Sequence, residues 1–171
     1  MKITTELRMN KKLLVFVVIL FTWGCAPHYS LVKAEKIEMG EAYSVHPDIK
    51  WNGKTLEHAI LWTNNGMALD RIVFLNGIQE GNTLFGDEAS PKFRSDMNII
   101  EIAEFYSDSM KAVGNWAKSG TKQLKVEKFG PFDGFGFETT LVTKEGLAYK
   151  GLVSGAIIEK ELHLIFFMAT E

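Results

Sequence analysis

The C-terminal hairpin constrains the fold more than any other segment. Residues 147–158 and 162–169 are rich in β-branched and aromatic residues and are separated by Glu159-Lys160, which predicts two strands and a tight turn. In the second strand the sequence LIFF at residues 164–167 makes successive side chains apolar on both faces. We expect such a strand to lie in the interior of a sheet, with a layer over each face.

One amphipathic helix can supply the first of these layers. Apolar residues recur after Ser95 and Asp96 at spacings of three and four, the periodicity of a helix with one buried face. Either of those two residues can cap the helix, and Gly114 can end it. The second layer would come from the N-terminal strands or from a short helix at residues 115–118. The predicted stripe consists of Ile99, Ile102, Ala103, Tyr106, Met110 and Val113.

The remaining strands are marked by turn signals. Asn-Gly sequences at 52–53, 65–66 and 76–77 separate three apolar segments and predict an antiparallel meander. We therefore predict an α+β fold, an antiparallel β-sheet with one main amphipathic helix inserted between N-terminal and C-terminal strand groups. The expected strands are 41–51, 56–63 and 70–75 before the helix, and 124–129, 135–141, 147–158 and 162–169 after it.

This order of elements, β-β-β-loop-α-β-β-β-β with a long hydrophobic terminal hairpin, resembles the Mog1/PsbP-like fold. Members of that fold include small bacterial lipoproteins. The resemblance covers residues 41–171. It implies a fold only, because that fold serves unrelated functions.

The N-terminus has the three parts of a secretory signal. Residues 1–12 are polar and net positive, residues 13–21 (LLVFVVILF) are apolar, and Gly24 is a small residue before a potential cleavage point. The apolar run is shorter than the roughly 20 residues that cross a bilayer as a helix. We expect residues 1–24 to be a signal peptide that is removed before Cys25. The alternatives are an ordinary signal peptide, with Cys25 incidental, and an uncleaved anchor.

The sequence Thr22-Trp23-Gly24-Cys25 resembles the lipobox of bacterial lipoproteins. The resemblance implies cleavage before Cys25 and attachment of acyl chains, including palmitate, to that residue. Thr22 and Trp23 depart from the Leu and the small residue that the family prefers at these positions. Cys25 is the single cysteine in the chain, so it has no partner for an internal disulfide. Ala26 resembles the signal for the outer membrane in a Gram-negative host, where the protein would face the periplasm.

The rest of the chain divides into a tether and a domain. Residues 25–40 contain the lipidated cysteine, Pro27 and mixed charges without a sustained period, which predicts a tether. Residues 41–171 then form a single domain. The first 24 residues hold four of the 19 basic residues and one of the 21 acidic residues, so the remainder has a net charge of −5. An acidic domain without a basic stripe is a poor candidate for binding nucleic acid.

The sequence contains no catalytic or cofactor motif. His46 and Asp48 could contribute two metal ligands, but a third is not evident. Ser154 lacks the glycine that a G-x-S-x-G nucleophile elbow places two residues before the serine. The carboxylates of Glu80, Asp87 and Glu88 share one loop, which makes a glycosidase-like pair only formally possible.

The long irregular segment at residues 79–96 is the strongest candidate for a binding site. Loops of this length often have a function, and aromatic side chains near it could form a concave patch for a small apolar ligand or a peptide. The alternative is that these aromatic residues belong to the core. The candidate patch consists of Phe85, Phe93, Trp51, Trp62 and Trp116.

The sequence thus favours a non-enzymatic envelope lipoprotein, anchored to the bilayer through acylated Cys25. Its domain would be a binding or accessory module for a protein or small molecule. An envelope hydrolase and an inhibitor or immunity-type lipoprotein are the alternatives.

Overall fold

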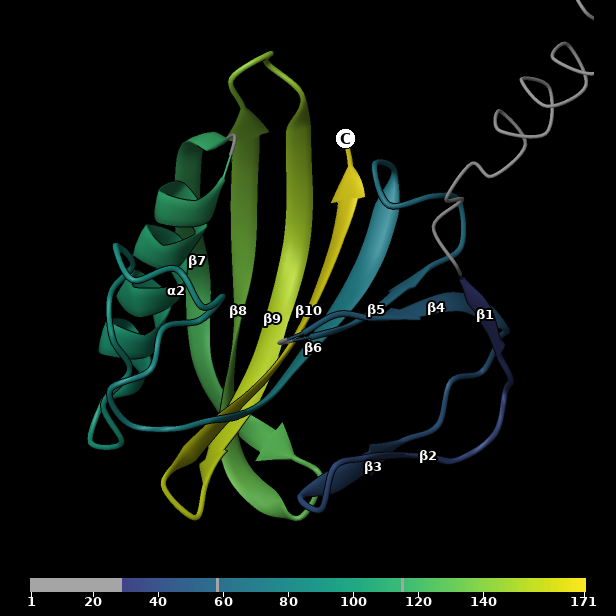
Figure 1. Ribbon diagram of the computed structural model, residues 1–171. Helices are drawn as coiled ribbons and strands as arrows, with labels where there is room; N and C mark the ends of the chain where they lie inside the picture. Colours follow the sequence, from purple (N-terminus) through teal and green to yellow (C-terminus); the bar gives the residue numbers. More distant parts are fainter. Residues whose placement is uncertain (1–28, 58, 115) are drawn as a thin grey trace, which may run out of the picture.

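The computed structural model describes residues 29–57, 59–114 and 116–171. The predicted signal peptide and Cys25 lie outside the described residues. The described chain forms an antiparallel sheet of eight strands, a separate two-stranded ribbon and a helix (Figure 1), which confirms the α+β class. Across the sheet the strands are β1 (Ser30–Val32), β4 (Trp51–Thr55), β5 (Ile60–Thr63), β6 (Asp70–Ile78), β10 (Glu161–Thr170), β9 (Ala148–Ile158), β8 (Phe132–Thr143) and β7 (Trp116–Phe129).

Strand β10 lies in the interior of the sheet, as its apolar sequence predicts. It pairs with β6 on one side and β9 on the other, both antiparallel. Because side chains alternate along a strand, Leu162, Leu164, Phe166 and Met168 share one face and are all buried. His163, Ile165 and Phe167 share the opposite face, where Phe167 is 37% exposed.

Helix α2 (Ile99–Val113) covers the first of these faces, which we call the front face. Its N-cap is Asn98 instead of the predicted Ser95 or Asp96. The Asn98 side chain accepts hydrogen bonds from the backbone N–H groups of Ile100 and Glu101, and the Glu101 carboxylate accepts one from the Asn98 N–H. This reciprocal capping box satisfies donors that a helix start leaves unpaired.

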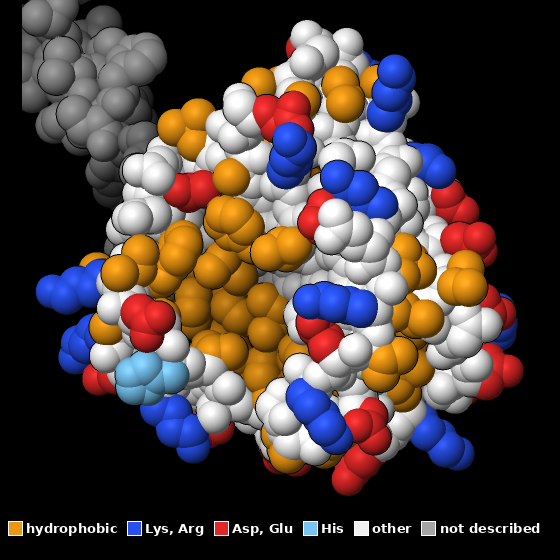
Figure 2. All heavy atoms as spheres, turned by 180° about the vertical axis from the view of Figure 1, so that it is seen from behind, with side chains coloured by type: hydrophobic (Ala, Val, Ile, Leu, Met, Phe, Trp, Pro, Cys, Tyr) orange, Lys and Arg blue, Asp and Glu red, His pale blue; other side chains and the backbone are white. Residues whose placement is uncertain are grey.

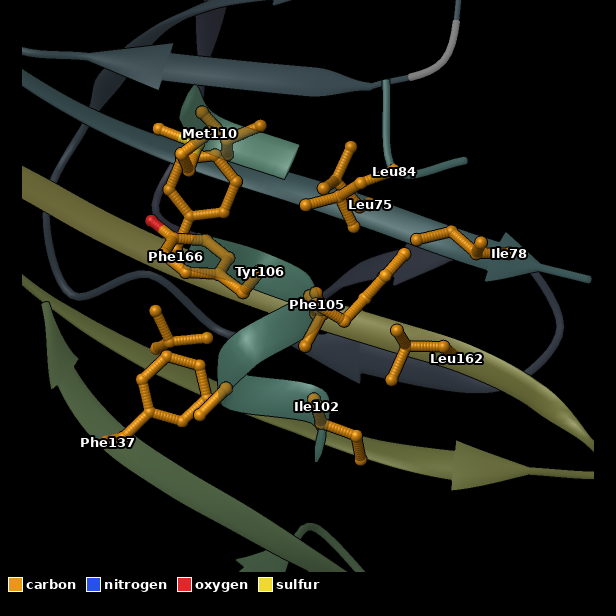
Figure 3. Packing of buried hydrophobic residues seen from close by; sticks show 14 of the residues in the cluster. Leu75, Ile78, Leu84, Ile102, Phe105, Tyr106, Met110, Phe137, Leu162 and Phe166 are labelled. Atoms are coloured by element: carbon orange, nitrogen blue, oxygen red, sulfur yellow. The ribbon is translucent and has the colours of Figure 1, made fainter. Parts of the chain in front are cut away.

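The front core is closely packed. Ile102, Tyr106 and Met110 of α2 pack onto the sheet, and Leu84 from the loop before the helix closes one end of the cluster (Figure 3). Two glycines of β9 permit this packing. A Cβ at Gly155 would lie 2.4 Å from the His163 carbonyl oxygen, and one at Gly151 would lie 2.3 Å from that of Phe167.

The opposite face, which we call the back face, is covered only in part. Strands β2 (Ile37–Met39) and β3 (Tyr43–Val45) form the two-stranded ribbon, which packs against this side of the sheet. The predicted helix at 115–118 is wrong, because β7 begins at Trp116 and continues for 14 residues. The second layer is therefore the N-terminal ribbon.

The predicted tether at 25–40 is also wrong over its described part. Ser30, Leu31 and Val32 pair with β4, and Met39 is 1% exposed. Apolar residues at alternate positions, Ile37 and Met39, place this segment in the domain. The domain thus begins by Tyr29 instead of residue 41. None of the described helices is long and apolar enough to cross a membrane.

Candidate functional site

The loop at residues 79–96 is folded back on itself and contributes to the core. The N–H of Gly81 donates to the carbonyl oxygen of Phe93 at 2.9 Å, and the N–H of Phe93 donates to that of Asn82 at 2.8 Å. Leu84 and Phe93 are 1% and 0% exposed. This loop therefore stabilises the front core and does not present Phe93 to a ligand.

The sheet separates the five aromatic residues that the sequence suggested as one patch. Phe85, Phe93 and Trp116 pack with the front core, whereas Trp51 and Trp62 pack on the back face. Trp62 is 3% exposed. A single patch of these five residues is therefore wrong, and only Trp51 and Trp62 lie in a common cluster.

That back-face cluster forms a concave apolar surface. Three of its residues are buried and eight are only partly buried, because the short ribbon covers less of the sheet than α2 does. Figure 2 shows these apolar side chains gathered in a hollow. We call this cluster the back-face hollow; its members are Val32, Ile37, Met39, Tyr43, Val45, Trp51, Ile60, Trp62, Ile72, Phe74 and Ile165.

Backbone register brings these residues together. Ile165 pairs with Phe74, Phe74 pairs with Ile60, and Ile72 pairs with Trp62. Paired residues in an antiparallel sheet point to the same face, so an apolar row crosses β10, β6 and β5. Gly53 continues the row on β4, where a Cβ would lie 2.5 Å from a methyl group of Val32 and 3.3 Å from the Trp62 ring. This close approach explains why a glycine stands in β4.

Three adjoining clefts surround the hollow. A cleft of about 310 Å³ lies between β1, β4, β5 and the start of the ribbon, and it is lined by Val32, Ile37 and Trp62. It shares Thr55 and Ile60 with a second cleft of about 560 Å³ at the end of β6. A third, of about 650 Å³, reaches from Met39 to His163. The hollow is therefore continuous with open space at several of its margins.

The second and third clefts meet at a polar point, Asn76 and Gly77 of β6. The Tyr43 hydroxyl donates to Asn76 Oδ1 at 2.6 Å, and the Gly77 N–H donates to His163 Nδ1 at 3.3 Å. The His163 ring meets the Tyr43 ring edge-on at 5.9 Å. Burial lowers the pKa of His163, with Glu161 acting in the opposite direction, and burial raises the pKa of Tyr43. Both groups are therefore held neutral beside an apolar surface.

Beyond β10 the back face carries both apolar and charged groups: Phe129, Ala156 and Ile158 form a small buried cluster, and ion pairs lie beside it. Glu127 lies across β9 from the hollow, where Lys125 is 2.8 Å away and Ser154 donates to it at 3.1 Å. These two contacts lower the pKa of Glu127 against the effect of burial. Lys122 and Glu138 form a further ion pair at 3.1 Å. Charged groups of β7 and β8 thus lie on the same side of the sheet as the hollow.

The other residues considered from the sequence have local contacts. Ser154 bonds Glu127 as described, and Glu80 accepts from Ser95 at 2.6 Å. Asp87 accepts from the N–H of Ala89 at 3.1 Å, within its own turn. His46 and Asp48 are exposed. No group of three or more His, Cys, Asp or Glu residues could hold a metal ion in the part of the chain that the structure describes.

Sequence reasoning missed most of the hollow. Val32, Ile37 and Met39 lie in the segment predicted to be a tether, and Ile72 and Ile165 lie in segments predicted to be strands. Two signals could have found it: the alternation Ile37-Glu38-Met39, and a β10 strand apolar on both faces. The second requires a cover, and among the described residues that cover is a ribbon of two three-residue strands.

Comparison with known proteins identifies no relative. No family model matches this chain. No curated protein and no solved structure matches it either.

Proposed function

We propose that this chain is an envelope lipoprotein whose domain is a non-enzymatic binding module, with the back-face hollow as its binding surface. The observation that carries the proposal is the incomplete cover of that face. Partly buried aliphatic and aromatic side chains line adjoining clefts there. Ligand sites in proteins are commonly concave, mostly apolar surfaces with a few polar groups.

The chemistry of the hollow favours an amphiphilic ligand. The apolar part of the ligand would lie over Ile72 and Ile165. Its polar group would reach Asn76 at the junction of the two larger clefts. Glu41, Glu159 and Glu161 line the third cleft, which meets the second cleft at that junction. Three carboxylates disfavour an anionic group, so the polar part of the ligand is uncharged or cationic.

The proposed location of the protein in the cell envelope rests on the sequence at the N-terminus. The apolar run at 13–21, the lipobox-like sequence that ends in Cys25 and the lack of any other cysteine support export and acylation. The mature protein would be held in the cell envelope, at the outer membrane facing the periplasm if the host is Gram-negative. Mass spectrometry of the mature N-terminus, with Cys25→Ser as the control, tests this part.

A Mog1/PsbP-like arrangement, with the helix between an N-terminal and a C-terminal group of strands, is part of the same proposal. Its support is that α2 lies in the chain between β6 and β7 and that a long hairpin, β9–β10, ends the domain. An experimental structure superposed on members of that fold would test it.

Binding can be tested with the uncharged fluorescent probe Nile red. We expect its emission to rise and shift to the blue with the unchanged protein, and this response to be lost in Ile72→Asp and Ile165→Asp. Val126→Asp is the matched control, because Val126 is 78% exposed on the edge strand β7, away from the hollow. Dodecyltrimethylammonium should displace the probe at lower concentration than dodecyl sulfate.

Circular dichroism of each variant establishes that the fold is retained. Equal Nile red responses in all four proteins would refute the hollow as a binding surface. A milder pair, Ile72→Ser and Ile165→Ser, serves if either aspartate variant fails to fold.

A further inference from the structure

Exposed apolar side chains gather at the end of the molecule where the described chain begins. The Tyr29 hydroxyl contacts Met67 Sδ at 3.7 Å, and the Tyr149 hydroxyl donates to the Ala68 carbonyl at 2.8 Å. The Thr170 N–H donates to the Leu69 carbonyl at 3.0 Å. These contacts hold the β5–β6 turn, the start of β9 and the C-terminus together at the upper end in Figure 1, and the Tyr29 side chain reaches this end through Met67.

The turns at this upper end have apolar tips. Met67 and Leu69 in the β5–β6 turn are 45% and 52% exposed, and Leu147 in the β8–β9 turn is 46% exposed. Val113, the last residue of α2, is 40% exposed next to the strand that begins at Trp116. Turns are normally polar, so apolar residues at the tips of two neighbouring turns are unusual and suit contact with an apolar partner.

A cation and aromatic rings lie directly behind these tips. The Arg71 guanidinium lies 5.7 Å from the Trp116 ring centre and 5.6 Å from that of Tyr149, and it donates to the Met67 carbonyl at 3.2 Å. Tyr149 is buried in the front core and Trp116 packs against it, so this group supports the β5–β6 turn from behind while the apolar tips face outward.

The charges at the upper end are balanced. Lys150 pairs with Glu171 at 2.8 Å, and Asp70 accepts hydrogen bonds from Thr63, Asn64 and Asn65. Lys144 and Glu145 are neighbours in the β8–β9 turn. A surface with both signs of charge suits a largely zwitterionic bilayer better than a strongly anionic one.

The position of Cys25 brings a bilayer to this end. Four residue steps separate Cys25 from Tyr29, so the two are at most about 14 Å apart even in an extended chain. We propose that the upper end docks on the lipid bilayer, with Met67, Leu69 and Leu147 inserted at the interface. This inference rests on the proposed acylation of Cys25 and adds a fixed orientation to it. The back-face hollow would then open sideways from the membrane.

The test uses the full mature lipoprotein reconstituted in vesicles of phosphatidylethanolamine and phosphatidylcholine. With Cys25 acylated the protein has no free thiol, so a cysteine introduced by Leu69→Cys or Leu147→Cys can be labelled with an environment-sensitive fluorophore. Val126→Cys is the control, because Val126 pairs with Phe135 near the other end of β7. We expect a blue shift and quenching by spin-labelled lipid at 69 and 147, and neither at 126.

A second set of variants tests the apolar contact itself. In the Leu147→Cys protein, adding Leu69→Asp should reduce lipid quenching about tenfold, since transfer of a leucine from water is worth about that factor or more. Leu152→Asp, at a 59% exposed site on the back face, should leave quenching unchanged.

Each outcome separates the two claims. Acylated Cys25 with equal, water-like emission from all three labels would overturn docking and leave the anchor intact. An unacylated Cys25 in the mature protein, read by mass spectrometry, would overturn both. Loss of Nile red binding in the hollow variants, with docking retained, would confirm that the two surfaces act separately.

Discussion

The front and back faces of the large sheet are built from the same strands, yet their covers differ. On the front, α2 and the 79–96 loop bury a cluster of twenty hydrophobic residues and leave seven only partly buried. On the back, the β2–β3 ribbon leaves eight of the eleven residues of the hollow partly buried, beside a smaller cluster in which Phe129, Ala156 and Ile158 are buried. A helix of 15 residues and a long loop cover a wide area, whereas a ribbon of two three-residue strands cannot. We infer that the front stabilises the fold and that the back is available for binding.

The largest effect should come from the front face, at Phe93. Phe93→Ala removes a 0% exposed ring and leaves a cavity, so we expect the free energy of unfolding to fall by about 3–5 kcal/mol. Urea unfolding followed by circular dichroism measures this. A loss below about 1 kcal/mol would mean that the loop is not part of the core, and the contrast between the faces would fail.

Close packing around Gly155 of β9 should give a further large loss of stability when this residue is enlarged. Gly155→Ala places a Cβ 2.4 Å from the His163 carbonyl oxygen and 2.6 Å from Leu164, which must shift. We expect a loss of about 2–3 kcal/mol in the free energy of unfolding. Gly120→Ala is the matched control on the edge strand, where the nearest atom is 3.4 Å away, and it should change stability by less than about 0.5 kcal/mol.

A pair of substitutions on β6 compares the two faces directly. Leu75 is 0% exposed in the front core, whereas Ile72 is a partly buried member of the hollow. Leu75→Ala should cost about 3 kcal/mol and Ile72→Ala about 1 kcal/mol, because an open site loses less burial and traps no cavity. Only the second should weaken Nile red binding. Similar stability losses for both variants would show that the back face is packed like the front.

The smallest expected effect is a pH dependence from His163 at the margin of the hollow. Burial lowers its pKa in the folded state, while in the unfolded chain the pKa is about 6.5. Below that pH the unfolded chain takes up a proton more readily than the folded protein, so stability falls as the pH falls below about 6.5. A protonated Nδ1 also cannot accept the Gly77 N–H.

His163→Gln should reduce the dependence of stability on pH between 7 and 5. Unfolding at pH 8, where neither protein carries a charge at this site, provides the baseline for the comparison. An unchanged slope would mean that His163 is solvated in the folded protein.

The fold was predictable where a local pattern reflects burial. The apolar run in β10 placed that strand in the interior of the sheet, and the spacing of Ile102, Tyr106 and Met110 gave the face of α2. The start of the helix was missed by two to three residues, because Ser95, Asp96 and Asn98 are all good caps. Only the reciprocal bonds between Asn98 and Glu101 favour the last of these.

The candidate site was less predictable, because burial of an aromatic residue depends on partners far away in the chain. Phe93 has sequence neighbours typical of a loop, and Trp62 lies near the end of a predicted strand beside a turn, yet both are in the core. Trp51 and Trp116 look alike in the sequence but lie on opposite sides of the sheet.

The sequence by itself determined the class of the fold, the interior position of β10 and the prediction of a lipidated Cys25, since each depends on local composition or periodicity. Tertiary structure decided which face is open. The segments at 30–32 and 37–45 are too short for their sequences to predict strands. The first forms a strand by pairing with β4, and within the second β2 pairs with β3. Because these strands are small, they leave the back-face hollow only partly covered. The size of the sheet face relative to its covering layer depends on tertiary packing, and no local sequence pattern shows it.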